Sequence, residues 1–65
     1  MKDGRNKINI VAGNEVEVVK KEDQGTGKLT LGVVKKILTK APTHPHGIKV
    51  LLESGEVGRV KDVLD

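Results

Sequence analysis

The chain has 65 residues, with twelve Lys and Arg against nine Asp and Glu, a formal net charge of +3, and no Cys, Phe, Tyr or Trp. A chain of about this length makes one small domain and buries only ~60 % of its unfolded surface. The lack of cysteine excludes a disulfide scaffold and a thiolate zinc site, and it fits a cytoplasmic protein. No apolar run approaches the ~18 residues that span a bilayer, and the charged N-terminus does not resemble a signal peptide.

The basic residues are unevenly distributed along the chain. Residues 1–40 hold nine Lys and Arg and five Asp and Glu, whereas residues 41–65 hold three and four. A basic surface attracts nucleic acid and other polyanions, although lysines also keep a small domain soluble. We expect residues 1–7 to form a flexible charged arm and residues 8–65 to form a single domain.

Alternation of apolar and polar residues predicts the first strands. A short edge strand is expected at residues 8–11, followed by a turn at residues 12–14. The alternation is clean over Glu15–Lys20, whose valines share one face. Residues 21–27 form a polar loop, which we interpret as the tip of a wide hairpin. The glycines and lysine at its end lack the spacing of a phosphate-binding loop.

The longest expected strand covers residues 29–38. Leu29, Leu31 and Val33 share one face, but the alternation is interrupted at Lys35 and Lys36. A bulge or strong bend near Gly32 or Lys35 would explain the interruption. A helix over residues 33–40 is the alternative, and the β-branched content favours the strand.

Residues 39–47 form a turn that Pro42 and Pro45 stiffen, because proline fixes its own φ and restricts the preceding residue. His44 and His46 flank the second proline. Three interpretations of the imidazoles remain open: a structural turn with hydrogen bonds to nearby backbone, a contact site for phosphate or peptide, and a metal site. The metal site is the least favoured, because a metal normally needs three or four ligands and no carboxylate shows ligand spacing here.

The C-terminal part of the chain predicts a hairpin. Residues 48–53 alternate as a half-buried strand, and residues 53–56 form a tight turn with Gly55 at positive φ. Residues 57–60 return as a strand with a bulge at Gly58. The apolar pair near the C-terminus is expected to form a short turn or a final strand.

These elements predict an all-β fold. About five short strands, glycine-rich turns and a core of Val, Ile and Leu indicate a small antiparallel SH3-like barrel of the Tudor or KOW kind. Closing the sheet removes exposed strand edges in a chain rich in valine. An OB-fold is the alternative topology, but it usually needs a longer chain.

Several motifs carry a resemblance to a known family. They are Asp23-Gln24, Gly27-Lys28-Leu29-Thr30, Gly32-Val33-Val34, Leu38-Thr39, His44-Pro45-His46-Gly47-Ile48-Lys49-Val50 and Gly55-Glu56-Val57-Gly58-Arg59-Val60. Over roughly residues 8–63 the chain resembles the YwbE family of short, uncharacterised microbial proteins. The resemblance implies a single domain and no particular activity. Members often carry Arg where this chain has Leu31 and Leu51, so it does not imply a strongly basic face.

The leading functional hypothesis is a nucleic-acid-binding module, for RNA, that contacts the phosphate backbone without a cofactor or metal. The candidate contact residues are Lys20, Lys21, Lys28, Lys35, Lys36, Lys40, His44, His46 and Arg59. Single-strand binders usually stack bases on aromatic rings, a contact that contributes ~1–3 kcal/mol per base. This chain has no Phe, Tyr or Trp and offers only His44, His46 and Arg59 as planar groups, so we expect weak, salt-sensitive, backbone-led binding.

A protein-interaction module is the alternative, through β-augmentation or a charged contact, since aromatic peptide grooves are excluded. An enzyme is not expected, because so small a barrel has little room for a water-excluding pocket. Arg59 is open to two interpretations: a solvated strand arginine paired with Glu53 or Glu56, or an anion-binding group beside the imidazoles.

Overall fold

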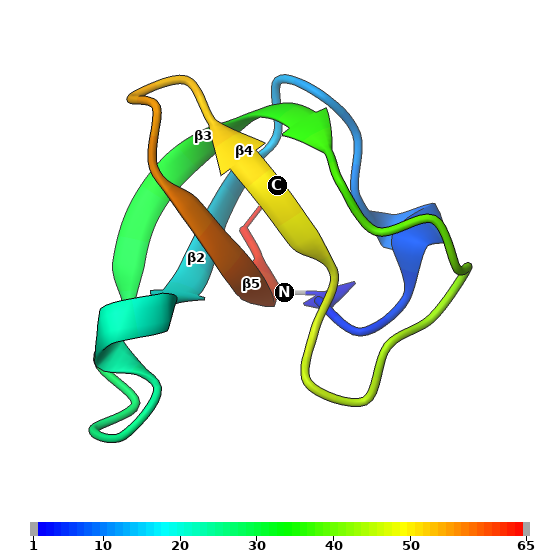
Figure 1. Ribbon diagram of the computed structural model, residues 1–65. Coiled ribbons are helices and arrows are strands. Elements are labelled where there is room, and N and C mark those ends of the chain that lie inside the picture. The colour runs from blue at the N-terminus through cyan, green and yellow to red at the C-terminus, as the bar shows by residue number, and fades with distance from the viewer. Residues whose placement is uncertain (1, 65) are drawn as a thin grey trace.

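The computed structural model describes residues 2–64 of the chain, and the side chains of residues 3–64. The elements are β1 (Lys2–Asp3), the 3-10 turn η1 (Lys7–Asn9), β2 (Glu15–Lys20), the 3-10 turn η2 (Lys21–Asp23), β3 (Thr30–Ile37), β4 (Lys49–Leu52) and β5 (Val57–Val63). Neighbouring strands follow the order β1-β5-β2-β3-β4, and β4 also pairs with β5. Strands β2 to β5 therefore close into an antiparallel barrel, with β1 added outside the ring (Figure 1).

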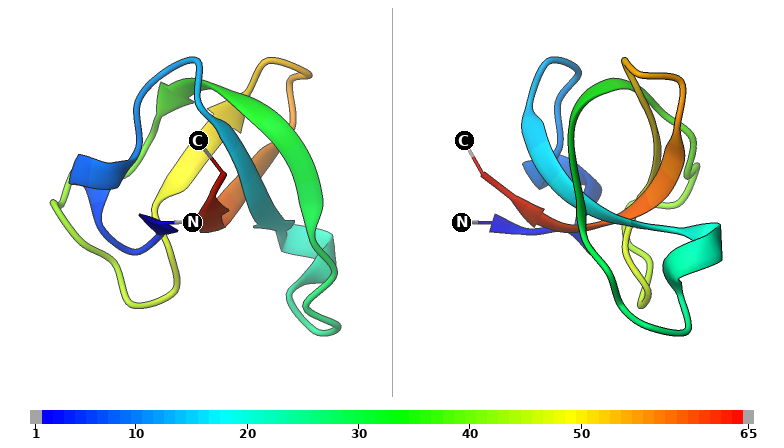
Figure 2. Two further views of the ribbon diagram at one scale, coloured as in Figure 1. Left: turned by 180° about the vertical axis from the view of Figure 1, so that it is seen from behind. Right: turned by 90° about the vertical axis from the view of Figure 1, so that its left-hand side faces the viewer.

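The prediction of a small all-β antiparallel barrel is confirmed. The right-hand view of Figure 2 looks into the ring formed by the strands. The described residues include no helix that is long and apolar enough to cross a membrane.

The core is entirely aliphatic. Its members are Ile10, Val16, Val18, Val34, Ile48, Val50, Leu52, Val60 and Val63. Each is at most 3 % exposed, and no polar or charged side chain of the described residues is buried with them. β-branched side chains suit a pleated surface, and fully burying one such side chain contributes about 1.5–3 kcal/mol.

Strand β3 bends where the sequence pattern is interrupted. Its first half pairs with β2, and its second half pairs with β4, with a register shift between Val34 and Lys36. The irregularity predicted near Gly32 or Lys35 is therefore present, and it lies at Lys35. Leu31 is 58 % exposed, whereas Val34, on the opposite face of β3, is fully buried. The face that Leu29 and Leu31 share is therefore the outer face of the barrel.

The β4–β5 hairpin follows the sequence prediction closely. Val50 and Leu52 are fully buried, and Gly55 in the connecting turn has φ +93°. The predicted bulge at Gly58 was wrong, because the only register shift in the β2–β5 pairing lies between Glu17 and Val18. Gly58 instead allows close packing, since a methyl group there would lie 2.7 Å from a Val18 methyl.

The first residues are bonded to the barrel rather than separate from it, which corrects the expected flexible arm at residues 1–7. Strand β1 pairs with the end of β5. The Gly4 carbonyl accepts from the Ile48 amide at 2.9 Å, the Arg5 carbonyl accepts from the His44 amide at 3.0 Å, and the Lys7 amide donates to the Pro42 carbonyl at 2.8 Å. Met1 lies outside the described residues.

The expected edge strand at residues 8–11 is also corrected. The chain makes the 3-10 turn η1 there, because the Asn6 side chain caps it by accepting from the Ile8 amide at 3.2 Å. Ile8 is 82 % exposed and Val11 is 61 % exposed, so Ile10 alone of the three apolar residues enters the core. The predicted turn at residues 12–14 is present, with Gly13 at φ +96°.

Candidate nucleic-acid interface

The β4–β5 hairpin presents two rows of side chains on the outside of the barrel. Lys49 lies opposite Arg59, and Leu51 lies opposite Val57. Directly opposed residues of an antiparallel pair share a face, and neighbours along a strand alternate. Since Val50 points into the core, these four side chains point outward.

Two adjoining hollows lie on this face and share Val19, Gln24 and Arg59. The larger, with a volume of about 410 Å³, is lined by Val19, Gln24, Gly27, His46, Arg59 and Lys61. The smaller, with a volume of about 220 Å³, is lined by Val19, Lys21, Gln24, Lys49, Val57, Gly58 and Arg59. We call these two hollows together the basic cleft. Four Lys and Arg residues and one imidazole line it, and no carboxylate appears among the described lining residues.

The walls of the basic cleft come from two loops that are far apart in sequence. The loop after β2 contributes Gln24 and Gly27, and the proline–histidine turn contributes His46. Val19 belongs to the lining because it lies opposite Arg59 on the outer face, yet it is only 5 % exposed.

The proline–histidine turn holds two of the cations. Arg59 Nη1 donates to the Gly47 carbonyl at 3.3 Å, and Lys61 Nζ donates to the His46 carbonyl at 3.3 Å. Of the two interpretations of Arg59, pairing with Glu53 or Glu56 is not what the structure shows, because no ion pair among the described residues involves Arg59. Its guanidinium lies beside the turn and lines both hollows.

The two imidazoles have different surroundings. The His44 Nδ1 atom accepts a hydrogen bond from the His46 backbone amide at 3.1 Å, and the ring centroids are 5.8 Å apart. Burial, then the charges of Arg59 and His46, lower the pKa of His44 from its usual 6.5. His44 thus has the surroundings expected of a structural turn residue, whereas His46 lines the larger hollow.

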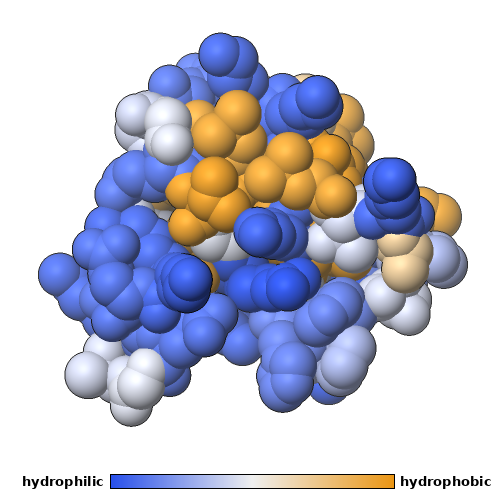
Figure 3. Space-filling model, in the orientation of Figure 1, coloured by the Kyte–Doolittle hydropathy of each residue, from blue (hydrophilic) through white to orange (hydrophobic). Residues whose placement is uncertain are grey.

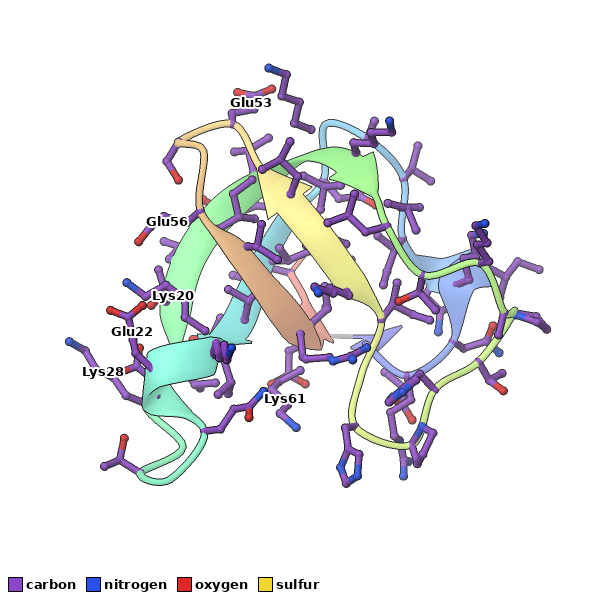
Figure 4. The ribbon with its side chains drawn as sticks, in the orientation of Figure 1. Lys20, Glu22, Lys28, Glu53, Glu56 and Lys61 are labelled. Carbon is purple, nitrogen blue, oxygen red and sulfur yellow. The ribbon has the colours of Figure 1, made fainter. Side chains whose placement is uncertain are left out.

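Lys20 is engaged in an ion pair. Its Nζ atom lies 2.7 Å from Glu56 Oε2 and 4.0 Å from Glu22 Oε2, and Figure 4 shows the three side chains together beside β2. The hydrogen bond from Lys20 lowers the pKa of Glu56, to which Ser54 also donates, and the same bond raises the pKa of Lys20. Lys20 is consequently less available to a ligand than the sequence suggested.

The remaining lysines predicted as contacts do not line the basic cleft. Lys36 is exposed and lies opposite Leu51, on the rim of the outer face. Lys28 is exposed before the start of β3, Lys35 is exposed within β3, and Lys40 is exposed beyond its end. Of the nine predicted residues, the structure therefore brings Lys21, His46 and Arg59 together.

Sequence reasoning missed Lys49 and Lys61. A signal for Lys49 was present, because a tight turn at residues 53–56 places Lys49 opposite Arg59 once the two strands pair. Lys61 sits beside the irregular register of β2 and β5, which no local pattern reveals. In Figure 4 Lys61 lies apart from the Lys20 cluster, toward the proline–histidine turn.

A metal site has no support in the geometry. Among the described residues, no three His, Asp or Glu side chains are grouped so that they could hold a metal ion. The two imidazoles face different surroundings, and one ring nitrogen of His44 is already used by the backbone.

Comparison with known proteins places the chain in a family. Residues 3–63 match the sequence profile of a family described as "Uncharacterized conserved protein (DUF2196)". The chain belongs to the DUF2196 family. A similar curated protein is the "Uncharacterized protein YwbE" of Bacillus subtilis (strain 168), which is 52 % identical over 61 residues, 94 % of each chain. The family resemblance expected from the sequence is thus confirmed, and the DUF2196 match spans the barrel and the basic cleft. No solved structure matches the chain.

Proposed function

We propose that this protein is a non-enzymatic module that binds nucleic acid, RNA in particular, through the phosphate backbone. The observation that carries the proposal is the convergence of Lys21, Lys49, Arg59 and Lys61, together with His46, on the basic cleft. Phosphate contacts from Lys and Arg supply most of the sequence-independent affinity of nucleic-acid-binding proteins.

The shape of the face favours a strand of RNA over the major groove of duplex DNA. Proteins that read the major groove insert a helix or a two-stranded ribbon into it. The described residues form no α-helix, and the basic face is hollowed rather than protruding. A strand whose phosphates are accessible from one side fits such a face better.

The composition of the cleft supports binding rather than catalysis. Nucleophilic and general acid–base catalysis need a nucleophile and base held within hydrogen-bond reach of each other. The cleft offers one imidazole, and the described residues that line it include no Ser, Thr or carboxylate. We therefore include no cofactor and no reaction in the proposal.

A matched pair of double variants tests the proposal. K21E/K49E reverses two charges in the cleft, and K35E/K40E makes the same change in net charge at exposed sites outside it. Contact with about four phosphates of a single strand predicts a slope of log K against log[salt] near −3. Fluorescence anisotropy with a labelled 12-nucleotide RNA should show K21E/K49E weakening binding at least tenfold and flattening the slope, while K35E/K40E keeps both close to wild type.

Two results would overturn the proposal. Equal losses in the two double variants would mean that net charge, and not the cleft, governs binding. No RNA binding by the wild type, or binding that is indifferent to salt, would point to a protein-interaction module instead. Circular dichroism of each variant checks that the barrel remains folded.

A further inference from the structure

An aliphatic pair lies inside the basic face. Leu51 and Val57 lie opposite each other on the outer side of β4 and β5, and Val57 is 38 % exposed. Lys36 lies opposite Leu51 on its other side. The next outward row of the hairpin holds Lys49 and Arg59, so cations flank the pair on two sides.

The pair is continuous with the basic cleft. Val57 lines the smaller hollow together with Lys21, Lys49 and Arg59. Figure 3 shows apolar side chains gathered over the upper part of β4 and β5, with hydrophilic ones directly below them. A ligand seated on Lys49 and Arg59 therefore also covers Val57.

We propose that the ligand is a single strand and that its bases rest on the Leu51–Val57 pair while its phosphates contact Lys49 and Arg59. This inference rests on the proposed function. A phosphate gains nothing from aliphatic surface, whereas an unstacked base has an apolar face to bury. In a duplex the base faces are already stacked on one another, so only a single strand can cover the cations and the aliphatic pair together.

The Leu51–Val57 pair, which we call the platform, explains how a chain without Phe, Tyr or Trp can hold bases. Burial against Leu51 and Val57 is sequence-tolerant, because every base presents a face. Aliphatic contact is weaker than aromatic stacking, so an aromatic side chain placed at the platform should strengthen binding. An aromatic side chain elsewhere on the barrel should not.

The test uses Val57→Trp, with Leu31→Trp as the matched control. Leu31 is exposed on the outer face of β3 and lies opposite Glu17. Because the natural chain has no aromatic residue, each variant carries one fluorophore. With a 12-nucleotide oligouridine, Val57→Trp should bind about tenfold tighter than wild type or better, as aromatic stacking predicts, and its emission should be quenched. Leu31→Trp should bind as wild type does, without quenching.

The ligand comparison separates this inference from the proposed function. Inorganic polyphosphate should bind Val57→Trp without quenching, and an RNA duplex should bind more weakly than the single strand. Salt-dependent RNA binding with neither quenching nor tightening in Val57→Trp would overturn the platform but leave backbone binding standing. Equal binding of duplex and single strand would do the same, and no RNA binding by any variant would overturn both. Should Val57→Trp fail to fold, Val57→Tyr carries the same test through its own emission.

Discussion

His44 and His46 stand one proline apart, yet the fold gives their imidazoles different roles. The His44 Nδ1 atom accepts a hydrogen bond from the His46 backbone amide and so stabilises the turn. The His46 side chain lines the larger hollow. The same turn supplies the carbonyls that hold Arg59 and Lys61. The hydrogen bond between His44 and His46 therefore lies within the same turn whose carbonyls accept from two of the cations.

Acidification should loosen this turn before the barrel unfolds. Because the pKa of His44 is lowered from 6.5, the fold favours the neutral ring. Its contribution to stability is complete above pH 6.5 and is lost as the pH falls from there through the lower folded value. An NMR titration should place the His44 midpoint below 6.5, and the His46 amide should lose exchange protection over the same range. A His44 midpoint at or above 6.5 would contradict the acceptor role.

Among the elements, the N-terminal segment contributes more than its length suggests. Residues 2–7 join the end of β5 to the proline–histidine turn through paired backbone groups. Gly4 lies at the centre of this contact, is buried, and leaves no room for a methyl group against the Val60 carbonyl. Gly4 is therefore required because a side chain would not fit, and not because its φ is positive.

Gly4→Ala should consequently destabilise the protein by about 1–3 kcal/mol, the usual range for overpacking a tight site. Gly25→Ala is the matched control, because a methyl group at Gly25 would meet no atom within 4 Å and its φ is not positive. The control should be neutral or slightly stabilising, since alanine restricts the unfolded chain. Urea unfolding followed by circular dichroism measures both, and equal midpoints would contradict the tight contact.

An element could be predicted from the sequence when a local pattern of residues determines it, and could not when its partners lie far away in the sequence. Strands β2 and β4 carry period-two patterns with one buried face, and the bulge in β3 is visible where that pattern is interrupted at Lys35. The N-terminal segment carries no such pattern, because its partners lie far away in the sequence, some 35 to 60 residues for the backbone bonds, and most of them bond to its backbone rather than to its side chains. The Asn6 side chain accepts from the Ile8 amide and stabilises a 3-10 turn at Lys7–Asn9, where the alternation of apolar residues had predicted a strand.

The candidate site was predictable only in part for a similar reason. Because residues 1–40 carry a surplus of Lys and Arg, the sequence predicted that most of the contact residues are lysines in the N-terminal two-thirds of the chain. The cleft instead combines Lys21 with Lys49, Arg59 and Lys61. The last three come from residues 41–65, where Asp and Glu outnumber Lys and Arg by four to three, and closure of the barrel brings them beside Lys21. Pairing of Lys20 with Glu56 also depends on closure, because these residues are 36 positions apart.

At the scale of the whole molecule, the surface carries charge of both signs in separate places. Asp3 lies opposite Asp62, and Asp62 lies opposite Glu17, so three carboxylates stand in one row across β1, β5 and β2. Asp3 is compensated by Arg5 at 2.8 Å. Under the proposed function, this separation from the basic cleft would orient an approaching polyanion.

Like charges directly opposed on a sheet are destabilising. Replacing one with a cation should therefore help folding: Glu17→Lys should stabilise the protein by about 0.2–1 kcal/mol, with a gain that shrinks as salt screens the charges. Glu53→Lys, at an exposed turn position, makes the same change in net charge and serves as the control. Thermal unfolding at low and high salt measures both, and a gain of equal size in Glu53→Lys would show that only net charge mattered.

The pairing of Lys2 with Val63 allows the order of the strands along the chain to be rearranged. Since β1 and the end of β5 lie side by side (Figure 2), a short glycine–serine linker can join them, and the polypeptide becomes a closed loop of strands. New ends then belong at Gly25, in an exposed loop where a side chain would meet nothing, because exposed loop tips tolerate such cuts best. In this circular permutant the two strands that flank the opened loop become terminal, while every pairing of the barrel can persist.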